Sequence, residues 1–289
     1  MRFQFLKDNQ DKYNIKKACK TLNISRSGFY EYLQRKPSNR AIENEVLSGH
    51  IKRIFEEHKG RYGARRISKS LAKEGIYASH IRIGKLMRKT GLYARGTTNH
   101  YKRYHETTNN IERPNLLNQV FEAGGKNQIW IGDITYIHTK RGYLYLAVFL
   151  DVYSRRVVGW SMERHLKESL VIQAFSQAYW REKPTEGLIV HTDQGAQFTG
   201  GNFRSILKSH GAIQSNSRKG NPYDNAMMES FYRTLKRELV KGANFETPEQ
   251  AQKEIFQYIE LYYNTKRMHS SLDYLSPVQF ETQQSVSHN

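Results

Sequence analysis

The sequence predicts an all-α, basic front region followed by an α/β domain, and three observations support this prediction. Apolar residues recur at helical spacing through most of the first 90 residues. From residue 128 onward, segments rich in β-branched and aromatic residues alternate with helical ones. Residues 1–110 hold 25 of the 46 basic but only 9 of the 27 acidic side chains. This excess favours a nucleic-acid partner, with a merely soluble basic surface as the alternative.

The first segment, residues 1–40, is expected to form a helix-turn-helix. Its first apolar stripe at helical spacing consists of Ile15, Ala18, Cys19 and Leu22. After a turn at residues 23–24, Ser25 can cap a second helix. The residues at the start of that helix would then face the major groove, namely Arg26, Ser27 and Tyr30. A structural helical hairpin is the alternative.

Residues 41–95 are expected to form a second helical DNA-binding unit. Gly60 and Gly63 suit a turn between two helices, and the next helix can bury Ile67 and Leu71 while exposing cations. Residues 79–90 repeat this arrangement. Two such faces favour DNA contact over a solvated surface. The expected contacts are Arg65, Arg66, Lys69, Arg82, Lys85 and Lys89. Residues 96–126 lose the periodicity and are predicted to be a linker.

The back domain is predicted to be an RNase H-like core over residues 127–280, followed by a tail at 281–289. Closely spaced strand-like segments indicate an antiparallel meander, and the following segments alternate between helix and strand. The expected strands are 128–139, 142–152, 156–162, 188–191 and 212–214, with helices at 170–180 and 202–210. This order is typical of an RNase H-like sheet, in which three adjacent strands are followed by a helix, a strand, a second helix and a last strand.

Three carboxylates are expected to converge on that sheet. Asp133 lies in the middle of the first strand, Asp193 lies just past strand 188–191, and Glu229 lies on a later helix. The buried side of that helix is predicted to be Met228, Phe231, Leu235 and Leu239. Three carboxylates supply the hard oxygen ligands that a pair of Mg²⁺ ions needs for phosphodiester chemistry. For each residue taken singly there is an ordinary alternative: an aspartate in or after a strand often only satisfies a turn, and a helical glutamate is usually a solvated surface residue.

Thirty-five residues separate Asp193 from Glu229, and Lys236 follows seven positions later. This spacing resembles the DD(35)E-plus-Lys signature of retroviral integrases and related transposases. Further segments resemble OrfB transposases of the third bacterial insertion-sequence family, namely 25–30, 63–67, 191–198, 220–229, 263–272 and 276–277. The resemblance therefore covers nearly the whole chain and implies an integrase-like catalytic core.

The resemblance implies cleavage of DNA at the ends of a mobile element, followed by strand transfer. Asp133, Asp193 and Glu229 would hold two Mg²⁺ ions, with Mn²⁺ able to substitute, and Lys236 would orient the terminal strand. Asn225 and His191 are weaker expectations for support of these ligands, and for His191 a packed structural role is favoured. The implied partners are double-stranded DNA of the terminal repeats and the target, further copies of the chain, and an upstream OrfA protein or fusion.

Other features narrow the function class. Cys19 is the single cysteine, which excludes an internal disulfide and a cysteine-based zinc cage and is expected to be buried. The longest apolar run, residues 143–150, is too short to span a membrane, so we expect a bacterial cytoplasmic protein associated with the nucleoid when bound to DNA. Two alternatives are an RNase H-like nuclease without strand transfer and a catalytically silent DNA-binding regulator.

Overall fold

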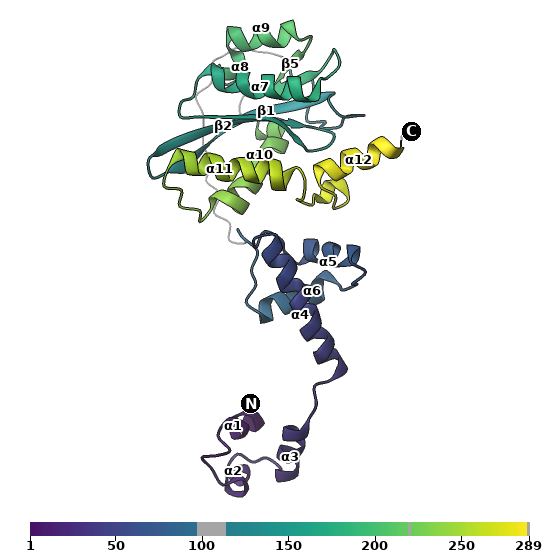
Figure 1. Ribbon diagram of the computed structural model, residues 1–289, viewed down its shortest axis with the longest axis vertical. Helices are drawn as coiled ribbons and strands as arrows, with labels where there is room; N and C mark the ends of the chain where they lie inside the picture. The colour runs from purple at the N-terminus through teal and green to yellow at the C-terminus, as the bar shows by residue number, and fades with distance from the viewer. Residues whose placement is uncertain (97–113, 219–220, 288–289) are drawn as a thin grey trace.

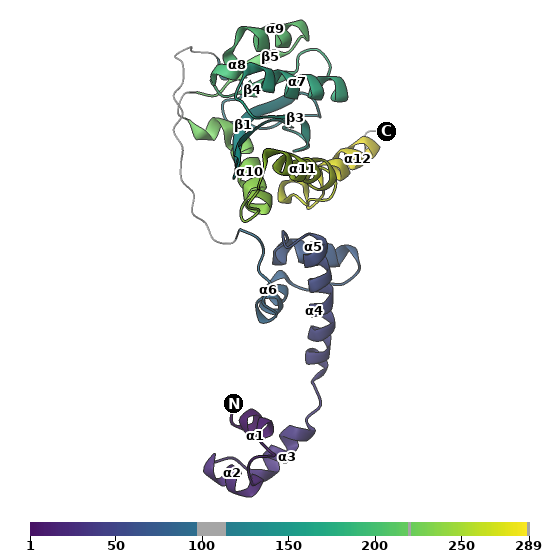
Figure 2. The same ribbon diagram turned by 60° about the vertical axis from the view of Figure 1, so that its left-hand side comes forward.

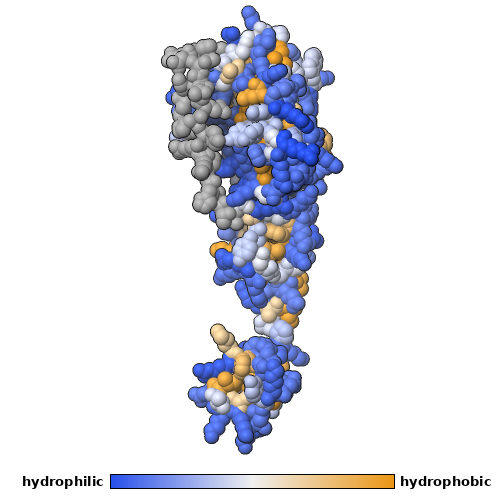
Figure 3. All heavy atoms as spheres, turned by 90° about the vertical axis from the view of Figure 1, so that its left-hand side faces the viewer, coloured by the Kyte–Doolittle hydropathy of each residue, from blue (hydrophilic) through white to orange (hydrophobic). Residues whose placement is uncertain are grey.

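The computed structural model describes residues 1–96, 114–218 and 221–287. The chain is elongated, with a three-helix cluster at one end, a second helical unit in the middle and an α/β domain at the other end (Figures 1 and 2). On the side shown in Figure 3 the described surface is largely hydrophilic, and it narrows between the three-helix cluster and the second unit. No helix in the described ranges has the length and apolar character needed to cross a bilayer.

At the predicted helix-turn-helix, the three-helix cluster contains two short helices joined by a turn. Its helices are α1 (Arg2–Asp8), α2 (Ile15–Thr21) and α3 (Arg26–Gln34). The Ser25 hydroxyl accepts from the Gly28 N–H, which confirms the predicted cap. Leu6, Cys19 and Phe29 form the buried centre. Helix α1 was not predicted, because seven residues hold little helical preference of their own and become ordered by packing Leu6 against α2 and α3.

The second helical unit packs directly against the α/β domain. Its helices are α4 (Asn39–Glu57), α5 (Ala64–Lys73) and α6 (His80–Lys89), and Gly60 adopts φ +73° in the turn after α4, as the sequence predicted. The Tyr62 hydroxyl donates to the Lys266 carbonyl at 3.1 Å and accepts from the Met268 N–H at 3.0 Å. The apolar cluster of this unit is continuous with the core below the sheet.

The α/β domain has the predicted sheet. Its strands are β1 (Ile129–Thr139), β2 (Gly142–Asp151), β3 (Val157–Glu163), β4 (Ile189–Thr192) and β5 (Ile213–Asn216), in the order β3-β2-β1-β4-β5. The first three are antiparallel, whereas β4 and β5 run parallel to β1. Helices α7 (Glu168–Glu182), α8 (Ala196–Thr199) and α9 (Gly201–Ser209) cover one face (Figure 1). Both faces of β2 are buried, which explains its nearly continuous apolar sequence.

The opposite face of the sheet is covered by the C-terminal helices. A short 3₁₀ turn, η1 (Pro222–Asn225), leads into α10 (Ala226–Leu235), which continues through a π-helical turn, η2 (Lys236–Val240). Helix α11 (Pro248–Tyr258) likewise continues through a π-helical turn, η3 (Ile259–Tyr263). The last elements are η4 (Ser270–Leu272) and α12 (Pro277–Ser287). The predicted buried side of α10 is confirmed at Met228, Phe231, Leu235 and Leu239.

The structure differs from the sequence prediction at the start of the tail and in the linker. Helix α12 extends into the predicted tail. Its Glu281 pairs with Arg156 at 3.0 Å, and the packed domain therefore continues beyond residue 280. Of the predicted linker, residues 97–113 lie outside the described residues. Residues 114–126 contain no helix or strand, yet Leu117 is buried and the Asn115 amide donates to Asp224 at 2.8 Å. This part of the linker is therefore fixed to the α/β domain.

Candidate active site

The sheet register places two of the predicted aspartates side by side. Asp133 shares a face of β1 with Ile131 and Ile137, which pack on the α10 side of the sheet, because alternate strand residues point the same way. Parallel pairing sets Thr192 of β4 opposite Gly132 of β1, so Asp193 emerges next to Asp133. A Cβ atom at Gly132 would lie 2.4 Å from the Phe149 ring, and glycine therefore permits the close packing of β1 on β2 here.

Hydrogen bonds orient the Asp133 carboxylate. Its Oδ1 accepts from the Ile134 N–H at 2.7 Å, and its Oδ2 accepts from the Asn225 side-chain amide at 2.9 Å. The Tyr232 hydroxyl donates to the Asp133 carbonyl at 2.6 Å. Burial, together with the carboxylates of Asp133 and Asp193, raises the pKa of Tyr232 well above its usual value, so the hydroxyl stays a donor. Asn225 thus contacts a predicted catalytic group.

The Asp193 carboxylate is held by the turn that follows β4. Its Oδ1 accepts from the Gly195 N–H at 2.9 Å, and its backbone carbonyl accepts from the Asn216 side chain. His191, two residues earlier, is fully buried, with Nδ1 2.8 Å from the Ser215 hydroxyl and Nε2 3.0 Å from the Asp224 carbonyl. Burial lowers the pKa of His191. These contacts are those of the packed structural histidine that the sequence favoured.

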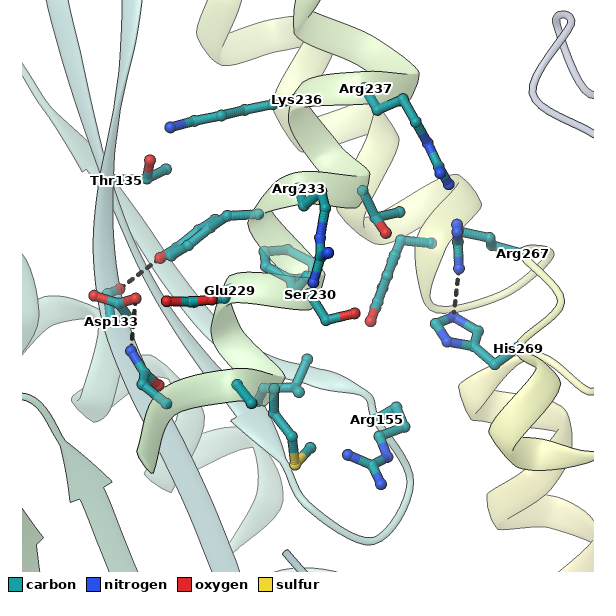
Figure 4. Close-up of a pocket in the computed structure, with 18 of the residues that line it drawn as sticks. Asp133, Thr135, Arg155, Glu229, Ser230, Arg233, Lys236, Arg237, Arg267 and His269 are labelled. Atoms are coloured by element: carbon teal, nitrogen blue, oxygen red, sulfur yellow. Dashed lines mark hydrogen bonds between the residues drawn. The ribbon is translucent and has the colours of Figure 1, made fainter. Parts of the chain in front are cut away.

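Glu229 lies in the first turn of α10 and faces Asp133 (Figure 4). The loop that leads into α10 is anchored by Asp224, which is 0% exposed. Its carboxylate accepts from the Arg218 N–H and guanidinium and from the side-chain amides of Asn115 and Gln119. The Arg218 guanidinium holds the pKa of Asp224 well below its usual range. The buried Asp224 carboxylate, with its several hydrogen-bond donors, therefore holds in place the loop that precedes Glu229.

Asp133, Asp193 and Glu229 line one cavity of about 1450 Å³. Among the described residues of its wall these three are the only acidic side chains, and the remaining charged ones are Arg66, Arg155, Arg233, Lys236, Arg237, Lys241 and Arg267. In Figure 4 the labelled carboxylates lie on one side of α10, whereas Arg155, Arg267 and His269 lie on the other. The cavity therefore combines a group of carboxylates with an extended cationic wall.

Lys236 begins the π-helical turn and extends toward β1 near Thr135 (Figure 4). Its Nζ lies 5.3 Å from the centre of the Tyr136 ring. Burial lowers the pKa of Lys236, and the nearby Asp133 carboxylate partly opposes this effect. The ammonium therefore lies on the carboxylate side of the cavity.

The donor set suits Mg²⁺, because carboxylate oxygens are its preferred protein ligands. Within residues 1–96, 114–218 and 221–287, however, no three histidine, cysteine, aspartate or glutamate side chains stand close enough to hold one ion together. Both carboxylate oxygens of Asp133 accept hydrogen bonds, from the Ile134 N–H and the Asn225 amide, and Oδ1 of Asp193 accepts from the Gly195 N–H. The chemistry of the three side chains therefore fits the metal, and ligation would require the carboxylates to approach one another.

A buried ion-pair network lies directly behind the cavity. Glu238, 1% exposed, accepts three hydrogen bonds from the Arg267 guanidinium and one from the Tyr258 hydroxyl. Burial disfavours its charge, but Arg267 outweighs burial and holds the pKa of Glu238 below its usual value. Burial and the Arg267 charge lower the pKa of His269 to about 2, so His269 is neutral. The network secures the turn that follows Lys236.

The structure separates the predicted DNA contacts into two groups. Arg26, Ser27, Tyr30, Arg65, Lys85 and Lys89 are exposed. Lys69 is also exposed, and its Nζ lies 5.2 Å from the Tyr274 ring centre. Arg66 and Arg82 are half-buried, and both guanidinium groups already contact other residues of the protein, so their contact with DNA stays a prediction. Arg66 donates to the Met268 carbonyl and pairs with Glu238 at 3.7 Å, and Arg82 pairs with Glu43 at 3.1 Å while donating to Asn44.

Several residues of the site were missed at the sequence level. Tyr232 lies three positions after Glu229 and thus on the same side of α10, a spacing that could have drawn attention to it. Asp224 was seen only as part of a motif, and its role depends on Asn115 and Gln119, more than 100 residues earlier. Arg155 lies between the expected strands 142–152 and 156–162, and no local pattern indicates that it lines the cavity.

Comparison with known families agrees with this architecture. Two family models described as Integrase core domain match residues 124–222 and 229–284, and one described as HTH-like domain matches residues 41–100. The fold is also similar to a chain of the simian T-cell lymphotropic virus intasome in complex with PP2A regulatory subunit B56 gamma. That likeness has a TM-score of 0.45 and 16% identity over 74% of this chain and 70% of the other. The chain thus joins an integrase core to an HTH-like domain.

Sequence relatives define the family more narrowly. The chain is 57% identical to the transposase for insertion sequence element IS904 of Lactococcus lactis subsp. lactis (strain IL1403), over 86% of this chain and 98% of the relative. It is 38% identical to transposase InsF for insertion sequence IS3A of Escherichia coli (strain K12), over 97% and 98%. The chain therefore belongs to the IS3 family of insertion-sequence transposases.

Proposed function

We propose that Asp133, Asp193 and Glu229 catalyse cleavage of DNA at the ends of an insertion sequence and transfer of the freed strand into target DNA. The observation that carries the proposal is that three carboxylates with DD(35)E spacing line one cavity of an integrase core. The three side chains would hold two Mg²⁺ ions, with Mn²⁺ as a substitute. When bound, the ions supply activation of the attacking oxygen and stabilisation of the leaving oxygen.

The remaining residues would position these groups and the DNA. Asn225 keeps one oxygen of Asp133 turned toward α10, and Tyr232 fixes the strand at the Asp133 carbonyl. Lys236 would contact a phosphate of the terminal strand, because its ammonium lies on the carboxylate side of the cavity. The exposed cations Arg65, Lys85 and Lys89 would contact the DNA backbone farther away. Terminal repeats and target DNA are thus the proposed partners. Assembly with further copies of the chain is proposed too, and an upstream OrfA stays a prediction.

The test is a cleavage and strand-transfer assay on DNA carrying the ends of the element that encodes the chain. We expect Asp193→Asn and Glu229→Gln each to lower both reactions by about 10²–10³-fold, because each removes a charged group from the reacting centre. Glu186→Gln, an exposed carboxylate outside the cavity, is the matched control and should leave both rates unchanged.

The two alternative functions give different results in this assay. A nuclease would cleave the ends but not join them to target DNA, whereas the proposal requires joined products. A catalytically silent regulator would show equal DNA binding and no metal-dependent product with the wild type and with Asp193→Asn. Either pattern would contradict the proposal.

A further inference from the structure

The turn between β2 and β3 presents an arginine to the same cavity as the three carboxylates. Arg155 lies across α10 from Asp133 (Figure 4). Hydrogen bonds to Asp151, which is 1% exposed, make the turn rigid, since its Oδ1 accepts from both the N–H and the hydroxyl of Ser154 and its Oδ2 accepts from the Asn127 N–H. The Arg155 N–H also donates to the Asp151 carbonyl. The position of Arg155 is therefore set by buried contacts.

Two properties of Arg155 are unfavourable in the protein alone. Its backbone has φ +61°, a left-handed conformation that residues with a Cβ atom rarely adopt. Its Nε is buried and has no hydrogen-bond partner among the described residues. Burial also lowers the pKa of Arg155, against the opposing effects of Tyr263 and Asp151. A buried guanidinium N–H without an acceptor is costly, and because Arg155 also lines the cavity, an anion bound there would help to offset this cost.

The charges of the cavity wall select the class of anion. The acidic wall residues in the described part of the chain are Asp133, Asp193 and Glu229, all contributed by the sheet and the first turn of α10. On the Arg155 side of α10 the wall instead contains Arg267 and neutral His269, and the hydroxyl residues Ser270 and Ser271 also line the cavity. Arg267 is already paired with Glu238, which leaves Arg155 as the cation there with an unused donor. A phosphate group matches the planar donors of a guanidinium.

We propose that Arg155 binds a backbone phosphate of the DNA strand that crosses α10, at a site separate from the phosphate that reacts at the carboxylates. This inference rests on the proposed function. In Figure 4 the exposed Ser230 and Arg233 of α10 lie on the side of Glu229 that faces away from Asp133, so a strand bound at Glu229 can pass over α10 toward Arg155. Arg155 then contributes to DNA affinity and to the path of the strand, not to bond breaking.

The test compares Arg155→Asn with the matched control Arg141→Asn in binding assays on DNA with the element's own end. Asparagine tolerates the left-handed backbone, and Arg141 is exposed in the β1–β2 turn outside the cavity. We expect Arg155→Asn to weaken binding about tenfold and to lower the salt dependence of binding by about one phosphate contact. The same DNA is then prepared with a neutral methylphosphonate at one backbone position at a time.

One methylphosphonate position, outside the scissile phosphate, should weaken binding by the wild type and by Arg141→Asn about tenfold but leave Arg155→Asn unaffected. Identical methylphosphonate profiles for the wild type and Arg155→Asn would overturn the proposal. Arg155→Gly guards against misfolding, because glycine adopts φ +61° without strain, and it must reproduce the Asn result. Binding is measured without metal and does not depend on cleavage. A wild type that fails to cleave would therefore contradict the proposed function, whereas the binding measurement would still decide the role of Arg155.

Discussion

At the scale of single residues, the site depends on side chains that hold the carboxylates as much as on the carboxylates themselves. Asn225, the residue that precedes α10, donates to Asp133 Oδ2 at 2.9 Å. An acidic ligand that is held by such a hydrogen bond has fewer orientations to lose when it binds an ion. Asn225 therefore connects the geometry of β1 to that of the helix that carries Glu229.

This contact gives a prediction for Asn225→Ala. The Mg²⁺ concentration that gives half-maximal cleavage should rise about 10- to 100-fold, because removal of a group that orients a metal ligand costs this much in affinity or activity. Asn202→Ala is the matched control, since the exposed Asn202 donates to Glu168 outside the cavity. The measurement is cleavage rate against Mg²⁺ concentration. Equal Mg²⁺ dependence in the two variants would show that Asn225 does not support the site.

Sequence patterns locate single residues of the cavity to different degrees. Local patterns indicate the strand or helix that carries each carboxylate, and Asp133, Asp193, Glu229 and Asn225 all line the cavity, but no three acidic side chains in the described ranges stand close enough to hold one ion. Arg66 and Arg82 looked like surface cations on helical stripes. Their partners, Glu238 and Glu43, lie on other elements, and a helical pattern does not show which cation a distant carboxylate will pair with.

At the scale of elements, the sheet could be predicted because each strand alternates or is continuously apolar according to the faces it buries. Helix α1 and the end of α12 could not, because their order comes from contacts with distant residues, as with the pairing of Glu281 and Arg156. The loop before α10 belongs to the same class. It is held by Asp224, whose amide donors Asn115 and Gln119 lie in the segment that precedes β1.

The loop before α10 provides a prediction for Asp224→Asn. The free energy of unfolding should fall by about 2–4 kcal/mol, because an amide cannot replace a buried anion that accepts from Arg218, Asn115 and Gln119. Cleavage should fall at least about tenfold, because Asn225 and Glu229 follow this loop directly. Urea unfolding and the cleavage assay measure the two effects. Asp273→Asn, an exposed carboxylate, is the control, and equal behaviour of both variants would refute the anchoring role.

At the scale of the whole molecule, the second helical unit and the α/β domain share one interface. Arg61 lies over the Tyr262 ring at 4.3 Å, Tyr62 exchanges hydrogen bonds with Lys266 and Met268, and the Arg66 guanidinium pairs with Glu238 behind the cavity. The unit that matches the HTH-like domain is thus connected to the turn that follows Lys236. The second helical unit and the α/β domain therefore form one packed body.

His58 makes the interface between the helical unit and the α/β domain sensitive to acid. Its ring stacks on Tyr62 with centroids 3.6 Å apart and meets the edge of Tyr262. Burial lowers the pKa of His58 to about 4, and Lys266, Arg61 and Arg66 add to this effect against Glu57. The unfolded chain, in which the pKa is about 6.5, then binds more protons between pH 6.5 and pH 4. Stability must therefore fall as the pH decreases through this window.

His58→Phe keeps an aromatic ring on Tyr62 but cannot bind a proton. Between pH 7 and pH 4.5 the wild type should lose about 2–3 kcal/mol more free energy of unfolding than the variant, as the His58 shift dictates. His191 and His269, whose pKa values are also lowered by burial, remain in both proteins, so the variant keeps a smaller acid sensitivity. Urea unfolding at the two pH values measures the difference. Parallel losses in the two proteins would mean that His58 is already protonated, or freely hydrated, in the folded interface.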